Sequence, residues 1–171
     1  MQTWDAIRAR SNMRDYANHP VDEADLLRIL EAARRSPSSW NEQRWDFVVS
    51  TDRRQLEQLS TVHPGAGHVA LSGATTVLVA PISGDSETAR SVEFDLGQAA
   101  MSMLLTATDL GLASAHASVD DQVLARGILG IPDDRYCAVQ IAIGHPARGT
   151  LRPLERMDRR PLEDVAHWGA W

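Results

Sequence analysis

The chain has 171 residues, 43% of them hydrophobic, and a formal net charge of -6 at pH 7. This length and composition suit one domain with a full hydrophobic core, so we expect a single domain over residues 1–171. The acidic balance disfavours nucleic-acid binding, which rewards a broad basic surface. All 17 basic residues are arginine, and the absence of lysine excludes a Walker phosphate loop, a kinase active site and a pyridoxal Schiff base.

Two features of the sequence indicate where the protein resides. The single cysteine, Cys137, lies in an apolar run and can form no internal disulfide, so we interpret it as a buried small hydrophobe and not as part of a secreted scaffold. The start of the chain, MQTWDAIRAR, carries charges where a signal peptide is apolar, and no run approaches the roughly 18 apolar residues of a membrane span. We therefore expect a cytoplasmic protein that does not engage a membrane.

The first helix is expected from Thr3 to about Arg10, and it leads into a basic turn with the sequence RSNMR. The planar guanidinium groups of Arg10 and Arg14 match the geometry of a phosphate. The side chains of Ser11 and Asn12, which lie between them, could complete an anion site. The alternative is a basic turn that is simply solvated.

A polar loop between a helix and a strand is the second candidate site. Asp22 and the apolar residues after it predict a helix that must end before Pro37, because proline lacks a donor N–H and holds Ser36 in extended geometry. Residues 45–50 (WDFVVS) are aromatic and β-branched enough to form a strand. Between them, hydroxyls, carboxamides and an indole offer a surface for a flat heteroaromatic ligand. These groups belong to Ser38, Ser39, Trp40, Asn41 and Gln43. The alternative is a well-punctuated connection without a ligand.

Two histidines accompany a break in the next part of the chain. A helix is expected from Asp52 to about Leu59 and an apolar strand over 75–80, with the sequence PGAG between them. His63 and His68 flank this break. They lack the close helical spacing of a zinc pair and have no cysteine or carboxylate partner nearby, so we do not expect a metal site.

The most strongly patterned segment, Ser91 to Gly111, predicts one long helix after a polar loop over 81–88. Its broad apolar stripe has alanine and serine at intervening positions, which allow other helices to approach closely. The helix is either the central core helix or part of a dimer interface. The segment after it, LASAHAS, is small and apolar apart from His116, so its backbone can approach a ligand closely.

The last expected elements are a helix from Asp120 to Gly130, a buried strand over 136–144 and a C-terminal tail over 146–171. The tail is rich in arginine and ends in tryptophans. A tail this basic on an acidic protein is either solvated or has an anion to meet. Because exposed tryptophans are costly, we expect the tail to pack on a partner subunit.

Five elements, taken together and in register, resemble the nitroreductase family of FMN enzymes over nearly the whole chain. They are the arginine turn, the loop PSSWNEQRW, the long helix ending in DLGLAS, the strand ending in IGHP and the C-terminal RRPLEDV. The resemblance implies an α+β fold with a mixed, mainly antiparallel sheet flanked by helices. It also implies an intertwined homodimer with FMN at the subunit interface, each site drawing on both chains. It favours the ligand-binding interpretations of the turn and the loop.

By matching position, the resemblance implies a role for each residue of the arginine turn. Arg10 would face the FMN phosphate, Asn12 would help to hold the ribityl phosphate, and Arg14 would face the pyrimidine edge of the isoalloxazine. Ser11 stands in the site where the family often has a second basic residue.

The resemblance assigns a second group of residues to the partner chain and a third to the flavin N5. From the partner chain, loop residues would line the flavin and arginines would complete phosphate binding. These residues are Pro37, Ser38, Ser39, Asn41, Arg159 and Arg160. The N5 contact would lie near Ala117 and Ser118. Arg44 stands where the family usually has a proline after the loop glutamine, which changes the exit of the loop.

The reaction that the resemblance implies is a ping-pong, two-electron reduction of nitroaromatics, quinones or similar acceptors by NADH or NADPH. FMN carries the electrons, so no catalytic side chain is required, and His116 is a candidate acid only for the oxidative half-reaction. Two alternatives remain. One is a specialised FMN-dependent oxidase, dehydrogenase or flavin-consuming enzyme of the same fold, and the other is a non-catalytic flavin-binding module.

Overall fold

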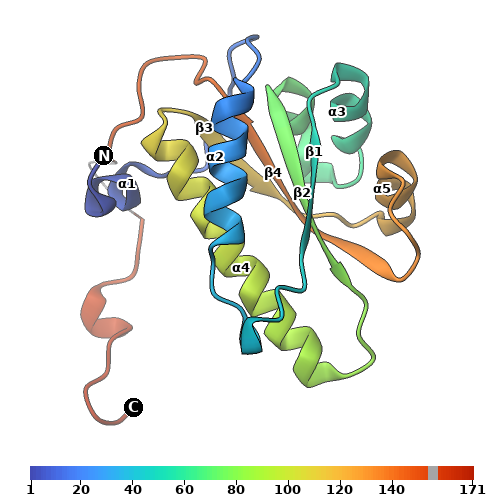
Figure 1. Ribbon diagram of the computed structural model, residues 1–171. Coiled ribbons are helices and arrows are strands. Elements are labelled where there is room, and N and C mark those ends of the chain that lie inside the picture. Colours follow the sequence, from blue (N-terminus) through green and yellow to red (C-terminus); the bar gives the residue numbers. More distant parts are fainter. Residues whose placement is uncertain (154–157) are drawn as a thin grey trace.

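The computed structural model describes residues 1–153 and 158–171 of the chain. It has the α+β architecture expected from the sequence, with four antiparallel strands in one sheet of order β1-β2-β4-β3 (Figure 1). The strands are β1 (Asp46–Ser50), β2 (Ala74–Pro81), β3 (Ala113–Ala117) and β4 (Arg135–Gly144). The α-helices are α1 (Thr3–Ala9), α2 (Glu23–Arg34), α3 (Arg53–Leu59), α4 (Ser86–Asp109) and α5 (Gln122–Leu129). Short 3-10 turns are η1 (Ser39–Asn41), η2 (Pro64–Leu71) and η3 (Leu162–Asp164).

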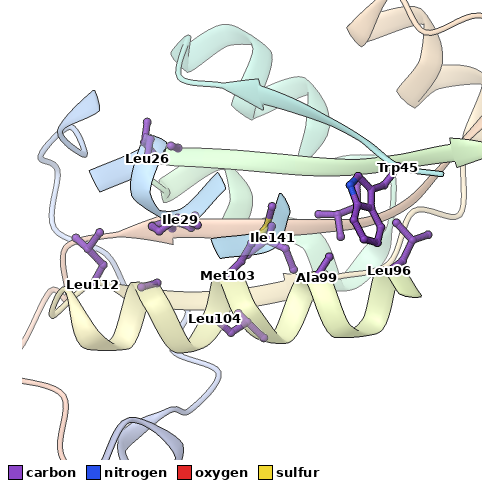
Figure 2. Close-up of a cluster of buried hydrophobic side chains, with 14 of the residues drawn as sticks. Leu26, Ile29, Trp45, Leu96, Ala99, Met103, Leu104, Leu112 and Ile141 are labelled. Atoms are coloured by element: carbon purple, nitrogen blue, oxygen red, sulfur yellow. The ribbon is translucent and has the colours of Figure 1, made fainter. Parts of the chain in front are cut away.

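The helices α2 and α4 cover one face of the sheet and form the larger core cluster with it. Figure 2 shows the side chains of Ile29, Met103 and Ile141 meeting between these helices and the sheet, and all three are 0% exposed. Full burial of each such side chain contributes about 1.5 to 3 kcal/mol. Because α4 supplies many of the side chains of this cluster, it is the central core helix of the chain.

The helix α4 begins five residues earlier than the sequence pattern indicates, at Ser86 and not at Ser91. The carboxylate of Asp85 accepts a hydrogen bond from the backbone N–H of Thr88 at 2.7 Å, which caps the helix. The polar loop expected over 81–88 is correspondingly short.

The elements α3, η2 and α5 cover the other face of the sheet and bury a second cluster. Cys137 belongs to this cluster and is 1% exposed, as expected of a small buried hydrophobe. Asp52 caps α3 as predicted, by accepting from the N–H of Gln55 at 2.9 Å. The cap of α5 is Asp121, one residue after the predicted Asp120.

The C-terminal tail runs away from the sheet and its helices (Figure 1). Trp168 and Trp171 are 95% and 103% exposed, so nothing in the described chain covers them. Glu155 and Arg156, which the sequence places in the basic tail, lie outside the described residues. Packing of the tail on a partner stays a prediction. No helix in the described ranges is long and apolar enough to cross a bilayer.

Candidate functional site

The arginine turn after α1 is held against the edge strand β3. The N–H of Met13 donates to the carbonyl of Ser114 at 3.0 Å, and Asn12 pairs with Ser114 in a parallel bridge. Nη1 of Arg10 donates to Oδ1 of Asn12 at 3.2 Å. The structure thus brings the predicted phosphate-binding side chains next to the strand that carries His116, Ala117 and the following Ser118.

The electrostatics of the turn favour an anion. Within the described residues, neither Arg10 nor Arg14 forms an ion pair. Tyr16, just after the turn, has a raised pKa because it is buried, and the nearby charge of Arg14 opposes that rise. Two guanidinium groups without an ion-pair partner in the described chain stand on one short turn, where they can attract an anion.

His68 on η2 is a buried side chain that the sequence analysis did not assign to the site. It is 7% exposed, and neither of its ring nitrogens has a hydrogen-bond partner in the described chain. Burial lowers its pKa, and the charges of Arg14 and His116 lower it further. The sequence analysis considered this histidine only as a metal ligand and did not expect that role, and nothing in its spacing reveals that the charges of Arg14 and His116 act on it in the fold.

The second candidate site, the loop after α2, has an unusual backbone. Trp40, Asn41 and Gln43 have φ values of 53°, 57° and 51°, in the left-handed region that non-glycine residues rarely adopt. Each costs about 1 to 2 kcal/mol, and such outliers are concentrated at ligand sites. The indole of Trp40 is 94% exposed. At the loop exit, Arg44, which stands where the family usually has a proline, forms an ion pair with Glu42 at 2.5 Å.

The helix α4 anchors this loop through four contacts, the longest of which runs from Nε2 of Gln98 to the carbonyl of Pro37 at 3.5 Å. The N–H of Ser39 donates to Oδ2 of Asp95 at 2.9 Å, and the hydroxyl of Ser39 bonds to that of Ser91. The hydroxyls of Ser36 and Ser102 are 2.8 Å apart. Asp95 is 6% exposed, so the loop is fixed by a buried carboxylate. Sequence reasoning missed Asp95, although a lone acid within an apolar helical stripe is a signal that could have been followed.

A cavity of about 370 Å³ lies on the other side of α4 and is lined by His116 and Tyr136. Burial raises the pKa of Tyr136. The α4 side of the cavity is formed by Glu93, Leu96, Gly97, Ala100, Met101 and Leu104. At 100° per residue these positions are centred on roughly the opposite side of the helix from those that anchor the loop. One chain therefore holds the loop and the His116 cavity on opposite faces of α4.

Arg159 and Arg160 remain apart from both groups. Their guanidinium groups donate to the backbone carbonyls of Asp158 and Asp164, within the tail itself. The predicted site residues thus fall into separate groups on one chain, namely the turn with β3, the loop on α4 and the tail.

Comparisons with known proteins identify the family. A model described as "Nitroreductase family" matches residues 7–64, a range that contains both the turn and the loop. The chain is 31% identical over 168 residues to "Putative NADH dehydrogenase/NAD(P)H nitroreductase" of Methanothermobacter thermautotrophicus, with 95% of this chain and 87% of the relative covered. The protein belongs to the nitroreductase family.

Two further proteins match this chain over nearly the whole length of both partners in the comparison. "NADH dehydrogenase" of Thermus thermophilus is 29% identical over 196 residues, covering 95% of this chain and 94% of the relative. A solved structure named "FMN-dependent Nitroreductase" from Clostridium difficile R20291 superimposes with a TM-score of 0.85 at 23% identity, covering 98% of this chain and 99% of the other. The predicted nitroreductase fold is confirmed.

Proposed function

We propose that the protein is an FMN-dependent NAD(P)H oxidoreductase that reduces nitroaromatics, quinones or similar acceptors. The observation that carries the proposal is the pair of half-sites that one chain holds apart, a cationic turn against β3 and a strained loop anchored on α4. Family membership and the names of relatives, which include FMN-dependent and NAD(P)H-dependent enzymes, support the same reaction class.

The arginine turn fits a flavin phosphate and the polar edge of its ring. The guanidinium group of Arg10, which already bonds to Asn12, would hold the phosphate with that amide and the neighbouring Ser11. Arg14 would face the pyrimidine edge, where its permanent positive charge stabilises the additional negative charge of the reduced ring. The short segment at Ala117 and Ser118 would meet N5. The lack of ion-pair partners at both arginines, within the described residues, supports these roles.

The anchored loop would line the flavin of the other subunit. The backbone N–H and the hydroxyl of Ser39 are both hydrogen-bonded to α4, which supports an anchoring role for that residue. The hydroxyl of Ser38 accepts from the N–H of Gln43 at 3.1 Å and so holds the loop closed. The exposed ring of Pro37 and the exposed side chain of Asn41 would then contact the flavin ring. A rigid loop loses little entropy when a ligand binds.

A homodimer would bring the two half-sites together. Large hydrophobic side chains that stay exposed on one chain support such an interface. They include Trp4, Phe94, Met101, Leu162, Trp168 and Trp171. Arg159 and Arg160 would complete the phosphate site from the partner once the tail, residues 146–171, packs on it.

FMN, when bound, supplies the two-electron chemistry between NAD(P)H and the acceptor. The chain's own residues hold the ring, keep its charge compensated and shape the space beside it. His116 lines the cavity with Tyr136 and could donate a proton to an acceptor there. The class of acceptor and the cytoplasmic location stay predictions.

The absorbance spectrum of the purified protein, recorded before and after anaerobic addition of NADH or NADPH, tests the proposal. We expect a flavin band that bleaches with NAD(P)H and returns when a quinone is added. Colourless protein that cannot be reconstituted with FMN refutes the proposal. A flavin band that NAD(P)H does not bleach identifies a non-catalytic flavin-binding module instead.

A further inference from the structure

His19 and His145 lie far apart in the sequence and meet at one end of the sheet. His19 stands between the arginine turn and α2, and His145 follows the last residue of β4. The centroids of their rings are 4.8 Å apart and the ring planes are nearly perpendicular, at 89°. His19 is exposed and His145 is half-buried, so water reaches the pair.

One nitrogen of each ring lies close to the same oxygen. Nδ1 of His19 is 2.8 Å from the carbonyl oxygen of Pro20, and Nε2 of His145 is 3.2 Å from it. The fold therefore gathers two imidazole nitrogens and one carbonyl oxygen at one place on the surface. Imidazole nitrogen is a preferred ligand of zinc, copper and nickel ions, and an oxygen can complete such a set.

The distances agree with three ligands on one ion. Imidazole nitrogens bind Zn²⁺ at about 2.0 to 2.1 Å and oxygens at about 2.0 to 2.2 Å. At tetrahedral or octahedral angles, a nitrogen and an oxygen ligand then lie about 2.8 to 3.4 Å apart, and the centroids of two imidazole ligands about 4.5 to 5.2 Å apart. The observed 2.8, 3.2 and 4.8 Å fall within these ranges.

The backbone around the pair is held in place before any ion binds. The N–H of Ala17 donates to the carbonyl of His145 at 2.8 Å, and the N–H of His19 donates to the carbonyl of Ala17 at 2.7 Å. A Cβ atom at Gly73 would lie only 2.9 Å from the carbonyl oxygen of His19, so this segment packs closely on the start of β2. Pro20 adds a fixed φ. Ligands held in this way lose little entropy when an ion binds.

We propose that His19, His145 and the carbonyl of Pro20 bind Zn²⁺ or another late first-row divalent ion, with water in the remaining positions. No group of three or more histidine, cysteine, aspartate or glutamate side chains in the described part of the chain could hold a metal. With two side-chain ligands, the site should bind more weakly than a structural zinc site, which has four. The ion would tie the segment after the arginine turn to the point where the tail begins.

Isothermal titration calorimetry of the purified protein with zinc chloride, after chelator treatment and dialysis, tests the site. We expect one Zn²⁺ per chain with a Kd in the micromolar range. His19→Phe and His145→Phe each remove one nitrogen ligand and should weaken binding by about tenfold or more. Magnesium chloride should not bind, because Mg²⁺ prefers oxygen ligands. If His145→Phe does not fold, as judged by circular dichroism, the exposed His19 decides through His19→Phe.

His167→Phe is the matched control. His167 is also exposed, but it lies in the tail, where its ring stacks on Trp171 at 4.4 Å. This variant should bind Zn²⁺ within twofold of wild type. Equal affinity in wild type and His19→Phe would show adventitious binding to surface histidines and overturn the proposal. Wild-type protein that binds no Zn²⁺ would overturn it too, because the two rings then only donate hydrogen bonds to the carbonyl.

Electron paramagnetic resonance of the protein with one equivalent of Cu²⁺ identifies the ligands directly. We expect hyperfine coupling from two imidazole nitrogens in wild type and from one in His19→Phe, a difference that a loss of stability alone would not produce. The same spectrum in both proteins would contradict the assignment. Neither measurement uses FMN, so the outcome is independent of the proposed function.

Discussion

Removing the carboxylate of Asp95 should weaken FMN binding although, on our assignment, this residue does not contact the cofactor. The side chain of Asp95 accepts a hydrogen bond from the backbone N–H of Ser39 at 2.9 Å, and Asp95 is only 6% exposed. A hydrogen bond to a buried charge contributes about 1.5 to 3 kcal/mol. The same loop stores the strain of Trp40, Asn41 and Gln43, at about 1 to 2 kcal/mol each. Without the anchor, the strained backbone can relax.

The expected loss follows from these values. Asp95→Ala should weaken FMN binding by about 10- to 150-fold if the whole hydrogen bond serves to hold the binding conformation. Asp95→Asn keeps an acceptor oxygen and loses only the assistance of the charge, about 1 kcal/mol, which is roughly fivefold. Titration of each apoprotein with FMN measures both constants.

Asp109→Asn is the matched control on the same helix. Asp109 pairs with Arg28 at 3.2 Å and with the N-terminal amino group of Met1 at 2.6 Å, and it lies 14 residues, about 21 Å, further along α4. Weakening these two partly exposed pairs should lower the free energy of unfolding by no more than about 1 kcal/mol each and leave FMN affinity unchanged. Wild-type FMN affinity in Asp95→Ala would refute the anchoring mechanism.

Three further predictions concern the remaining groups. Arg10→Ala should weaken FMN binding by about 1.5 to 3 kcal/mol. Arg14→Ala should also lower the reduction potential of the flavin, measured at saturating FMN. An unchanged potential in Arg14→Ala would contradict the electrostatic role of that residue. Deleting the chain after Arg148 should reduce both FMN binding and dimerisation, measured by sedimentation, and loss of neither would mean that the tail has no part in the site. His116→Ala should keep the rate of anaerobic flavin reduction within about threefold of wild type, a change below about 1 kcal/mol in the barrier. A hundredfold loss in stopped-flow measurements would show that hydride transfer needs this side chain.

Elements with strong hydrophobic patterns were predictable from the sequence. The apolar run over 75–80 predicts β2, and the structure extends it by one residue at each end. The start of α4 was not predictable, because Ser86 to Arg90 are polar and carry no periodic pattern. Only the hydrogen bond from Thr88 to Asp85 marks this start, and that contact is a property of the folded chain.

The candidate site was predictable in its residue types and not in its spatial relations. The RSNMR turn singled out Arg10 and Arg14, because guanidinium groups beside small polar side chains suit a phosphate. Sequence could not reveal that the loop packs on Asp95, because that contact joins residues 56 positions apart in the chain. Nor could it reveal the left-handed backbone at Trp40, a position where glycine or asparagine would have been the ordinary signal.

The separation of the turn on β3 from the loop on α4 has a genetic consequence. In the proposed dimer each active site takes its turn from one subunit and its loop from the other. A subunit with a defective turn and a subunit with a defective loop therefore combine so that one site inherits both lesions and the other inherits none. Two inactive alleles expressed together would partly restore activity, and each mixed dimer would work with a single functional centre.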